Sequence, residues 1–176
     1  MNQFTLTDDL LTGVADIDDQ HRKLFMLANQ LIEAGTTPRS RLAVLQALAF
    51  LGGYIDYHFA TEELAMRDNN YSSYVEHNTF HESFREQVCN LAEAAQTGES
   101  TELLILRVAA LLTDWLITHI RFMDRDFADY LKRITTKNSI HLPSSSRLKE
   151  EGLVPSDYVV PDHPGAAPAS KSPSSS

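Results

Sequence analysis

Residues 101–135 read TELLILRVAALLTDWLITHIRFMDRDFADYLKRIT, and this stretch decides the fold class. Its apolar side chains recur at steps of three and four residues, which is the period of one face of an α-helix. That face carries Ile105, Val108, Leu112, Leu116, Met123, Phe127 and Tyr130. Two polar residues, His119 and Asp124, lie on or beside it. The stretch therefore predicts a long helix that buries one side and takes polar groups inward with it.

Three further segments show the same helical period. We expect helices over about 17–34, from Thr37 to about Met66, and from Ser73 to Gly98. The links between the four helices are short, which places sequential helices side by side in opposite directions. The sequence thus predicts an all-α protein whose residues 1–136 form an up-down-up-down antiparallel four-helix bundle.

The composition of the chain changes near residue 136. Six of the seven prolines and nine serines lie from Pro143 onward, and such a segment lacks the apolar surface needed to fold alone. We therefore expect residues 137–176 to be a Ser/Pro-rich, mostly disordered tail. A short docked piece around Leu153–Val160 is compatible with its apolar residues, and the tail is a candidate contact for an unidentified protein partner.

Charge and length exclude several classes of function. The 176 residues carry a formal net charge of −9, which argues against non-specific binding to nucleic acid or to anionic membranes. One cysteine, Cys89, allows no internal disulfide and no zinc site built on several thiolates. The first residues have no basic, apolar leader pattern, and no long uncharged apolar run occurs, so we expect a soluble, cytoplasmic protein.

Polar residues interrupt the apolar faces of all four predicted helices. An unpaired imidazole or carboxylate costs several kcal/mol when it is buried, so these groups need partners. Metal binding satisfies imidazoles and carboxylates together. The candidate metal ligands are His21, His58, Glu62, His77, His81, His119 and Asp124.

The spacing of the candidates supports a metal site. His58 and Glu62 are four residues apart, as are His77 and His81, so each pair lies one turn apart on one helix face. We take the next carboxylate, Glu63, as an ordinary solvated charge, because the inward face selects Glu62. On the last helix the two candidates are five residues apart, which offsets the carboxylate round the helix and about 7.5 Å along its axis.

Seven protein ligands are more than one metal ion needs. Two ions, roughly 3.5–4 Å apart as in other two-metal sites and bridged by the two carboxylates, would use all seven. Imidazoles and carboxylates without thiolates suit iron among the redox metals, and zinc and manganese also accept these ligand types.

Four motifs occur in order along the chain. They are Gly13 with Ile17-Asp18-Asp19-Gln20-His21, then His58-Phe59-Ala60-Thr61-Glu62-Glu63, His77-x-x-x-His81, and Trp115-Leu116-x-x-His119-Ile120-x-x-x-Asp124. In residue types, order and spacing they resemble the hemerythrins, specifically the single-domain bacterial form, over about residues 6–134. Leu6 departs from the family, which usually has tryptophan there, and no motif covers the tail.

The resemblance implies a ligand assignment. It implies that His77, His81 and His119 bind one of two non-haem iron ions, and that His21 and His58 bind the other. Glu62 and Asp124 would bridge both irons beside a solvent-derived oxo or hydroxo group. The iron with two imidazoles would keep one position open.

The same resemblance implies a function. Dioxygen would bind reversibly at the open position, for storage or for delivery to oxygen-requiring enzymes, and the protein would not itself be an enzyme. The implied oxygen pocket consists of Leu24, Phe59, Trp115, Leu116 and Ile120. One alternative is an oxygen or redox sensor that signals through the tail. A diiron oxidoreductase ranks lower, because the motifs contain no additional acid or base.

Overall fold

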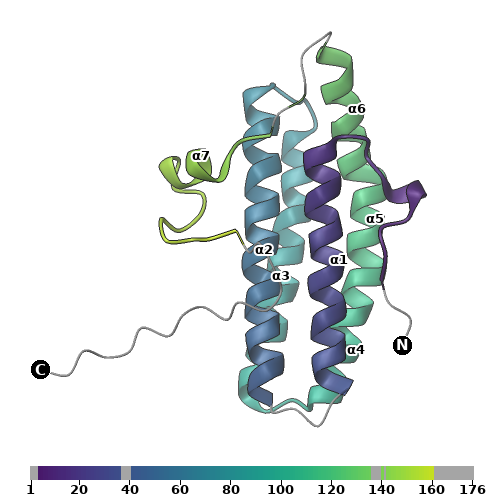
Figure 1. Ribbon diagram of the computed structural model, residues 1–176, viewed down its shortest axis with the longest axis vertical. Coiled ribbons are helices and arrows are strands. Elements are labelled where there is room, and N and C mark those ends of the chain that lie inside the picture. Colours follow the sequence, from purple (N-terminus) through teal and green to yellow (C-terminus); the bar gives the residue numbers. More distant parts are fainter. Residues whose placement is uncertain (1–3, 37–40, 136–139, 141, 161–176) are drawn as a thin grey trace, which may run out of the picture.

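The computed structural model describes residues 4–36, 41–135, 140 and 142–160. Four long helices lie side by side and antiparallel (Figure 1). The first three are α1 (Ala15–Thr36), α2 (Arg41–Asp68) and α3 (Tyr74–Thr97). The fourth runs through α4 (Thr101–Ala110), η2 (Leu111–Leu116), α5 (Ile117–His119), η3 (Ile120–Asp124) and α6 (Arg125–Ile134). No strand occurs among the described residues, so the predicted all-α bundle is confirmed.

The fourth helix is continuous but not regular. Its segments η2 and η3 are π-helical, whereas the flanking segments are α-helical. A π-helical turn contains one more residue than an α-helical turn, so it rotates the residues that follow relative to those before. By length and composition this helix, Thr101–Ile134, could cross a membrane. That is weak evidence for a span, since the core helix of a bundle passes the same test.

The junctions between helices have local causes. Gly98 ends α3 at φ 103°, a left-handed conformation that glycine adopts without steric cost. Two residues later the Ser100 side chain accepts a hydrogen bond from the Leu103 backbone N–H and starts the fourth helix. The predicted start of the second helix at Thr37 lies outside the described residues.

The N-terminal arm is fastened to the first turn of α1. The buried Asp18 carboxylate accepts hydrogen bonds from the backbone N–H and the hydroxyl of Thr12, each at 2.8 Å, and from the N–H of Gly13 at 3.1 Å. Hydrogen bonds to a charged acceptor are worth about 1.5–3 kcal/mol each. The arm therefore fixes how α1 enters the bundle, three residues before His21.

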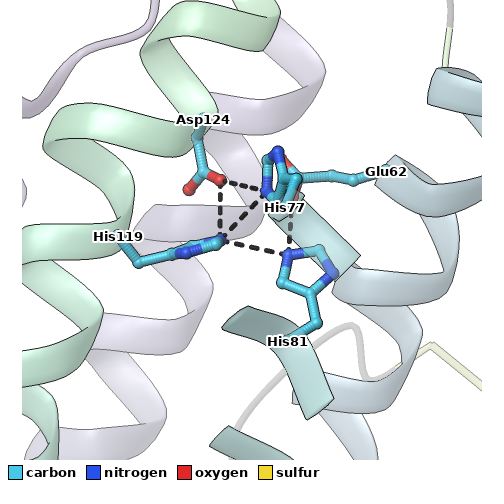
Figure 2. A group of neighbouring side chains, drawn as sticks. All are labelled: Glu62, His77, His81, His119 and Asp124. Atoms are coloured by element: carbon cyan, nitrogen blue, oxygen red, sulfur yellow. Dashed lines mark hydrogen bonds and ion pairs between the residues drawn. The ribbon is translucent and has the colours of Figure 1, made fainter. Parts of the chain in front are cut away.

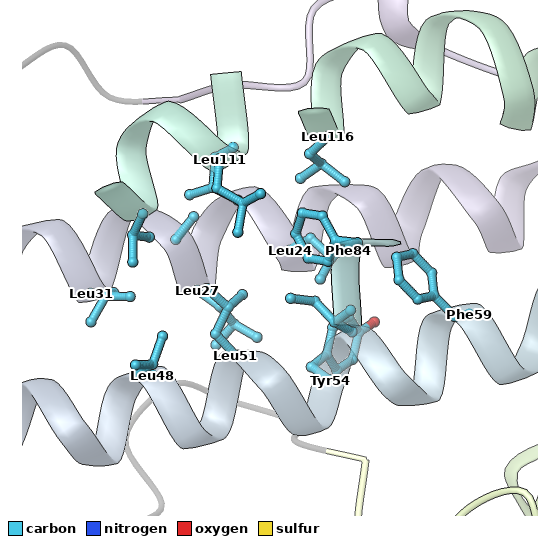
Figure 3. Packing of buried hydrophobic residues seen from close by; sticks show 14 of the residues in the cluster. Leu24, Leu27, Leu31, Leu48, Leu51, Tyr54, Phe59, Phe84, Leu111 and Leu116 are labelled. Atoms are coloured by element: carbon cyan, nitrogen blue, oxygen red, sulfur yellow. The ribbon is translucent and has the colours of Figure 1, made fainter. Parts of the chain in front are cut away.

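Among the described residues, one end of the bundle interior is filled mainly by leucines. Leu31, Leu48 and Leu51 are buried there with Leu27 and Leu111, and these side chains interdigitate between α1, α2 and the fourth helix (Figure 3). At about 25 cal/mol per Å² of apolar surface removed from water, such packing is the main stabilising contribution of the bundle.

The described part of the tail is docked rather than disordered. The short helix α7 (Ser145–Glu150) lies beside α2 (Figure 1), and its Leu148 is completely buried. Val154 is buried too, and Tyr158 stacks on Tyr57 with ring centroids 5.6 Å apart. The packing of Val154 and Tyr158 confirms the docked piece expected around Leu153–Val160, whereas the docking of α7 was not expected from the composition. The predicted boundary at 136 and the residues from 161 onward lie outside the described residues.

Candidate metal centre

All seven predicted ligand residues meet at one level of the bundle. Their side chains come from all four helices, and each is at most 2% exposed. The potential ligand atoms form two overlapping groups, within each of which every pair of atoms lies within 4.8 Å. The larger group joins His77, His81, His119, Glu62 and Asp124, and the smaller joins His21, His58, Glu62 and Asp124. The two carboxylates belong to both groups.

The larger group has the spacing of donors around one ion. The Nε2 atom of His119 lies 3.1 Å from Nε2 of His77 and 3.0 Å from Nε2 of His81 (Figure 2). Two ligands held at about 2.1 Å from one metal and at right angles to each other are about 3.0 Å apart. The three imidazoles are therefore arranged as neighbouring ligands of one metal.

A π-helical turn aligns Asp124 with His119. In a regular α-helix, residues five apart differ by about 140° around the axis, since each residue turns about 100°. Here η3 occupies the intervening turn, and Asp124 Oδ1 lies 3.0 Å from His119 Nε2. The π turn reduces the offset expected from a regular helix, and the Asp124 carboxylate still reaches the second group, as expected.

Asp124 connects the two groups through its two oxygens. Oδ1 lies 3.2 Å from Nε2 of His77, whereas Oδ2 lies 3.0 Å from Nε2 of His21. Glu62 Oε2 lies 3.4 Å from Nε2 of His81 and 3.9 Å from Nε2 of His58. Each carboxylate thus faces imidazoles of both groups, as a bridging ligand would.

Many of these buried atoms have no hydrogen-bond partner among the described residues. Both oxygens of Glu62 and of Asp124 are orphaned in this way, as are both ring nitrogens of His21 and Nε2 of His58. The carboxylate–imidazole separations quoted above are close approaches without hydrogen-bond geometry. Orphaned polar atoms cost about 1–3 kcal/mol each. A pair of metal ions would satisfy the four carboxylate oxygens, Nε2 of His58 and one of the two ring nitrogens of His21, so the residues fit a dinuclear centre.

The surroundings of the centre shift the pKa values of several of its side chains. Burial, together with the charge of His21, lowers the pKa of His58 well below its ordinary value, and burial beside His77 and His119 does the same to the pKa of His81. Both imidazoles are therefore neutral and able to bind metal. Burial next to Asp124 raises the pKa of Glu62 well above its ordinary value.

Asp124 has the opposite shift. Burial by itself would raise the pKa of this carboxyl, but His119, His21 and His77 hold it well below its ordinary value. Such a carboxylate remains ionised and ready to bind a cation. When no metal is present, Asp124 therefore ionises more readily than Glu62, because two adjacent buried negative charges repel each other.

Two further residues contact the Nδ1 atoms of ligand imidazoles. The sequence analysis predicted neither role. The Nδ1 atom of His58 lies 2.8 Å from the side-chain oxygen of Gln20, and Nδ1 of His81 lies 2.8 Å from Oε1 of Glu63. Each contact occupies Nδ1 and leaves Nε2 to face the centre. Glu63 is only 13% exposed, so its assignment as a solvated charge is wrong. Its position directly after Glu62 hid the fact that it reaches across to α3.

Two of the five predicted pocket residues contact ligand imidazoles, and the other three are buried in the bundle interior. Leu24, Phe59, Leu116 and Ile120 are at most 1% exposed, and Trp115 is half-buried (Figure 3 labels Leu24, Phe59 and Leu116). The Phe59 ring stacks on His81 with centroids 3.8 Å apart, and Trp115 stacks on His119 at 4.5 Å. Both stacked aromatic rings therefore lie against the three-histidine group. They limit the orientations that these imidazoles can adopt.

The fold and the site define an all-α bundle protein with a buried two-metal centre of imidazoles and carboxylates. Residues 12–131 match the family model of the hemerythrin HHE cation binding domain. The chain belongs to the hemerythrin family, whose members are diiron, oxygen-binding proteins.

Individual relatives agree with this placement. A bacteriohemerythrin of Stenotrophomonas maltophilia is 35% identical over 125 residues, which cover 71% of this chain and 79% of that protein. A bacteriohemerythrin of Pseudomonas aeruginosa is 32% identical with the same coverage. A crystal structure of a hemerythrin variant with a leucine-to-tyrosine substitution superposes with a TM-score of 0.64 at 25% identity, covering 73% of this chain and 97% of that one.

Proposed function

We propose that this protein binds dioxygen reversibly at a non-haem diiron centre, for storage or for delivery to oxygen-requiring enzymes. The supporting observation is the inequality of the two ligand groups. One group offers three imidazoles and the other offers two, while both share the same two carboxylates. The position with fewer protein ligands has room for an exchangeable ligand, as a closed structural site does not.

In this proposal the seven residues are the iron ligands. His77, His81 and His119 hold one iron, and His21 and His58 hold the other. Glu62 and Asp124 bridge the pair, because each faces imidazoles of both groups. When bound, the iron pair supplies the electrons that dioxygen binding requires.

In this proposal the apolar pocket residues determine whether oxygen is released as a neutral molecule or as superoxide. Leu24, Phe59, Leu116 and Ile120 exclude water from the neighbourhood of the centre, and Trp115 covers the side of His119. A dry, apolar surrounding disfavours the separation of charge. Oxygen is therefore expected to leave as a neutral molecule rather than as superoxide, which is what a carrier requires.

The test is the iron content together with an absorption spectrum recorded without oxygen, in air, and again after oxygen is removed. We expect two irons per chain and an oxygen-dependent band that disappears on removal and returns on readmission. Fewer than two irons would contradict the metal assignment. A single irreversible oxidation on first exposure to air would contradict reversible carriage.

Sensing through the tail is a second candidate. It is favoured by the stacking of Tyr158 on Tyr57, the residue next to His58, which connects the docked tail to the two-histidine side. Deletion of residues 137–176 distinguishes the two functions. An oxygen affinity that stays within twofold supports the carrier, whereas a larger change supports the sensor. A cytoplasmic location remains a prediction.

A further inference from the structure

The two metal positions are supported by chemically different groups. On the two-histidine side, His58 Nδ1 contacts the neutral amide oxygen of Gln20 at 2.8 Å. On the three-histidine side, His81 Nδ1 contacts the carboxylate of Glu63 at the same distance. Both contacts orient an imidazole. Only the second one places a negative charge behind it.

The Glu63 carboxylate is itself held in place. Nη1 of Arg85 lies 3.0 Å from the Glu63 oxygen that contacts His81. The same guanidinium contacts Asp56 at 3.3 Å and Glu82 at 2.6 Å, both exposed carboxylates near the surface. A guanidinium is always protonated and has several donors in a fixed plane. Arg85 can therefore hold Glu63 in one orientation.

The Glu63 carboxylate connects the Arg85 guanidinium to the imidazole, because its Oε1 atom contacts both Arg85 Nη1 and His81 Nδ1. The guanidinium also lies over the Phe59 ring, 5.2 Å from its centroid, and the same ring stacks on His81. The positive charge thus acts on the carboxylate, while the carboxylate acts on the imidazole. An imidazole that donates its N–H to a carboxylate is a more basic metal ligand than one that donates to an amide.

We propose that Glu63, held by Arg85, is a positioning residue that makes the three-histidine position the tighter iron site and the one that favours ferric iron more strongly. Gln20 gives His58 its orientation without this charge, so the two-histidine position binds iron less tightly. The inference rests on the proposed diiron function. It adds a difference in the charge behind the imidazoles to the difference in ligand count.

The experiment compares Glu63→Gln with Glu82→Gln. The first variant keeps an amide acceptor for His81 but removes the charge. The second removes an equal charge from the same arginine, one residue after His81, without touching an imidazole. Each purified full chain, freed of iron, is titrated with ferrous iron under anaerobic conditions against a competing chelator. The reduction potentials of the iron-loaded proteins are then measured.

We expect Glu63→Gln to weaken the tighter of the two iron affinities by about 10–100-fold and to leave the weaker one within about twofold. Its reduction potential should rise, with about 59 mV for each tenfold loss of preference for ferric over ferrous iron. Glu82→Gln should leave both affinities and the potential close to those of the unmodified protein.

Other results overturn the inference. If Glu63→Gln binds both irons with unchanged affinities and potential, the charge of Glu63 has no such role. A loss of thermal stability without a change in potential also contradicts it, since a merely structural contact would give that result. If Glu63→Gln does not fold, the variant Gln20→Glu provides the test. It places a negative charge behind His58, so it must reduce the difference between the two iron affinities. Failure of the unmodified protein to bind two irons would instead refute the proposed function.

Discussion

The two halves of the bundle interior differ in what holds them together. Toward one end, leucines such as Leu31, Leu48 and Leu51 fill the space between the helices (Figure 3). At the level of His77 and Asp124, imidazoles and carboxylates crowd together with oxygens that have no hydrogen-bond partner (Figure 2). The apolar half stabilises the fold. The polar half lowers the stability of the fold until a metal is bound. The stability supplied by the apolar half therefore allows the metal-free protein to fold.

The largest effect is expected at the residue that joins the two ligand groups. Asp124→Ala removes one oxygen that faces His77 and another that faces His21. We expect iron binding to weaken by more than about 100-fold, beyond the range typical of residues that only support a ligand. The measurement is iron per chain after desalting. Asp129→Ala on the same helix, at an exposed position, is the control and should retain two irons.

Substitutions in the apolar and the polar half should change the free energy of unfolding of the iron-free protein in opposite directions. Leu51→Ala should cost the iron-free protein about 2–5 kcal/mol, because it leaves a cavity in the apolar half. Glu62→Met should instead stabilise the iron-free protein by about 1–3 kcal/mol, because it removes two orphaned oxygens at similar volume. Denaturant unfolding of both variants measures this. The contrast fails if Glu62→Met destabilises the iron-free protein as Leu51→Ala does.

The pH dependence of the iron-free protein tests the polar half alone. The pKa values of His58 and His81 are lowered from 6.5 in the folded state, so below pH 6.5 the unfolded chain binds protons that the folded chain does not. Their contribution to stability is complete above pH 6.5 and falls as the pH decreases. The raised pKa of Glu62 opposes this from pH 4.5 upward, because the folded chain keeps a proton that the unfolded chain has lost.

Between these pH values the two imidazoles exceed Glu62 by one proton, and the pKa of Glu63, which burial also raises, reduces this excess further. We therefore expect the free energy of unfolding to fall by up to about 1.4 kcal/mol per pH unit as the pH decreases from 6.5 toward 4.5. Glu62→Gln removes the opposing proton and should make this fall steeper. Equilibrium unfolding of both iron-free proteins across the range is the measurement, and equal slopes would show that Glu62 does not hold a proton.

Much of this contrast is visible in the sequence, and the exceptions have physical reasons. The inward faces of four helical segments select His21, His58 and Glu62 along with the other four buried polar residues, since helical period depends only on local spacing. The role of Glu63 depends on where α3 places His81, which the local spacing on α2 does not contain. The π-helical turn η3 was equally hidden, because regular geometry is the default assumption for an unbroken helix.

The boundary between the halves is tested by Leu116→Asp. Leu116 is buried, three residues before His119 on the same helix, and a carboxylate there would bring water and charge into the apolar interior. We expect the oxygenated protein to autoxidise at least about tenfold faster, which corresponds to a barrier lower by about 1.4 kcal/mol. The decay of the oxygenated absorption band gives the rate. Leu106→Asp, at an exposed position of the same helix, is the control, and equal lifetimes in the two variants would contradict the pocket.

The smallest expected effect concerns an orphaned atom that no metal explains. The Tyr158 hydroxyl of the docked tail is buried without a hydrogen-bond partner among the described residues, while its ring stacks on Tyr57. Tyr158→Phe keeps the stack and removes the hydroxyl, so it should stabilise the protein by up to about 1 kcal/mol. Tyr158→Ala loses the stack and should destabilise it by about 1 kcal/mol.

Denaturant unfolding of the two Tyr158 variants separates the contributions of ring and hydroxyl. If Tyr158→Phe is as destabilising as Tyr158→Ala, the hydroxyl has a partner, such as a bound water, and an orphaned atom in this protein does not by itself indicate a metal. The metal assignment would then rest on the spacing of the donors alone. If Tyr158→Phe is more stable and still binds two irons, the orphaned hydroxyl of the tail only costs stability. The orphaned atoms of the metal centre differ from it, because they are needed to hold iron.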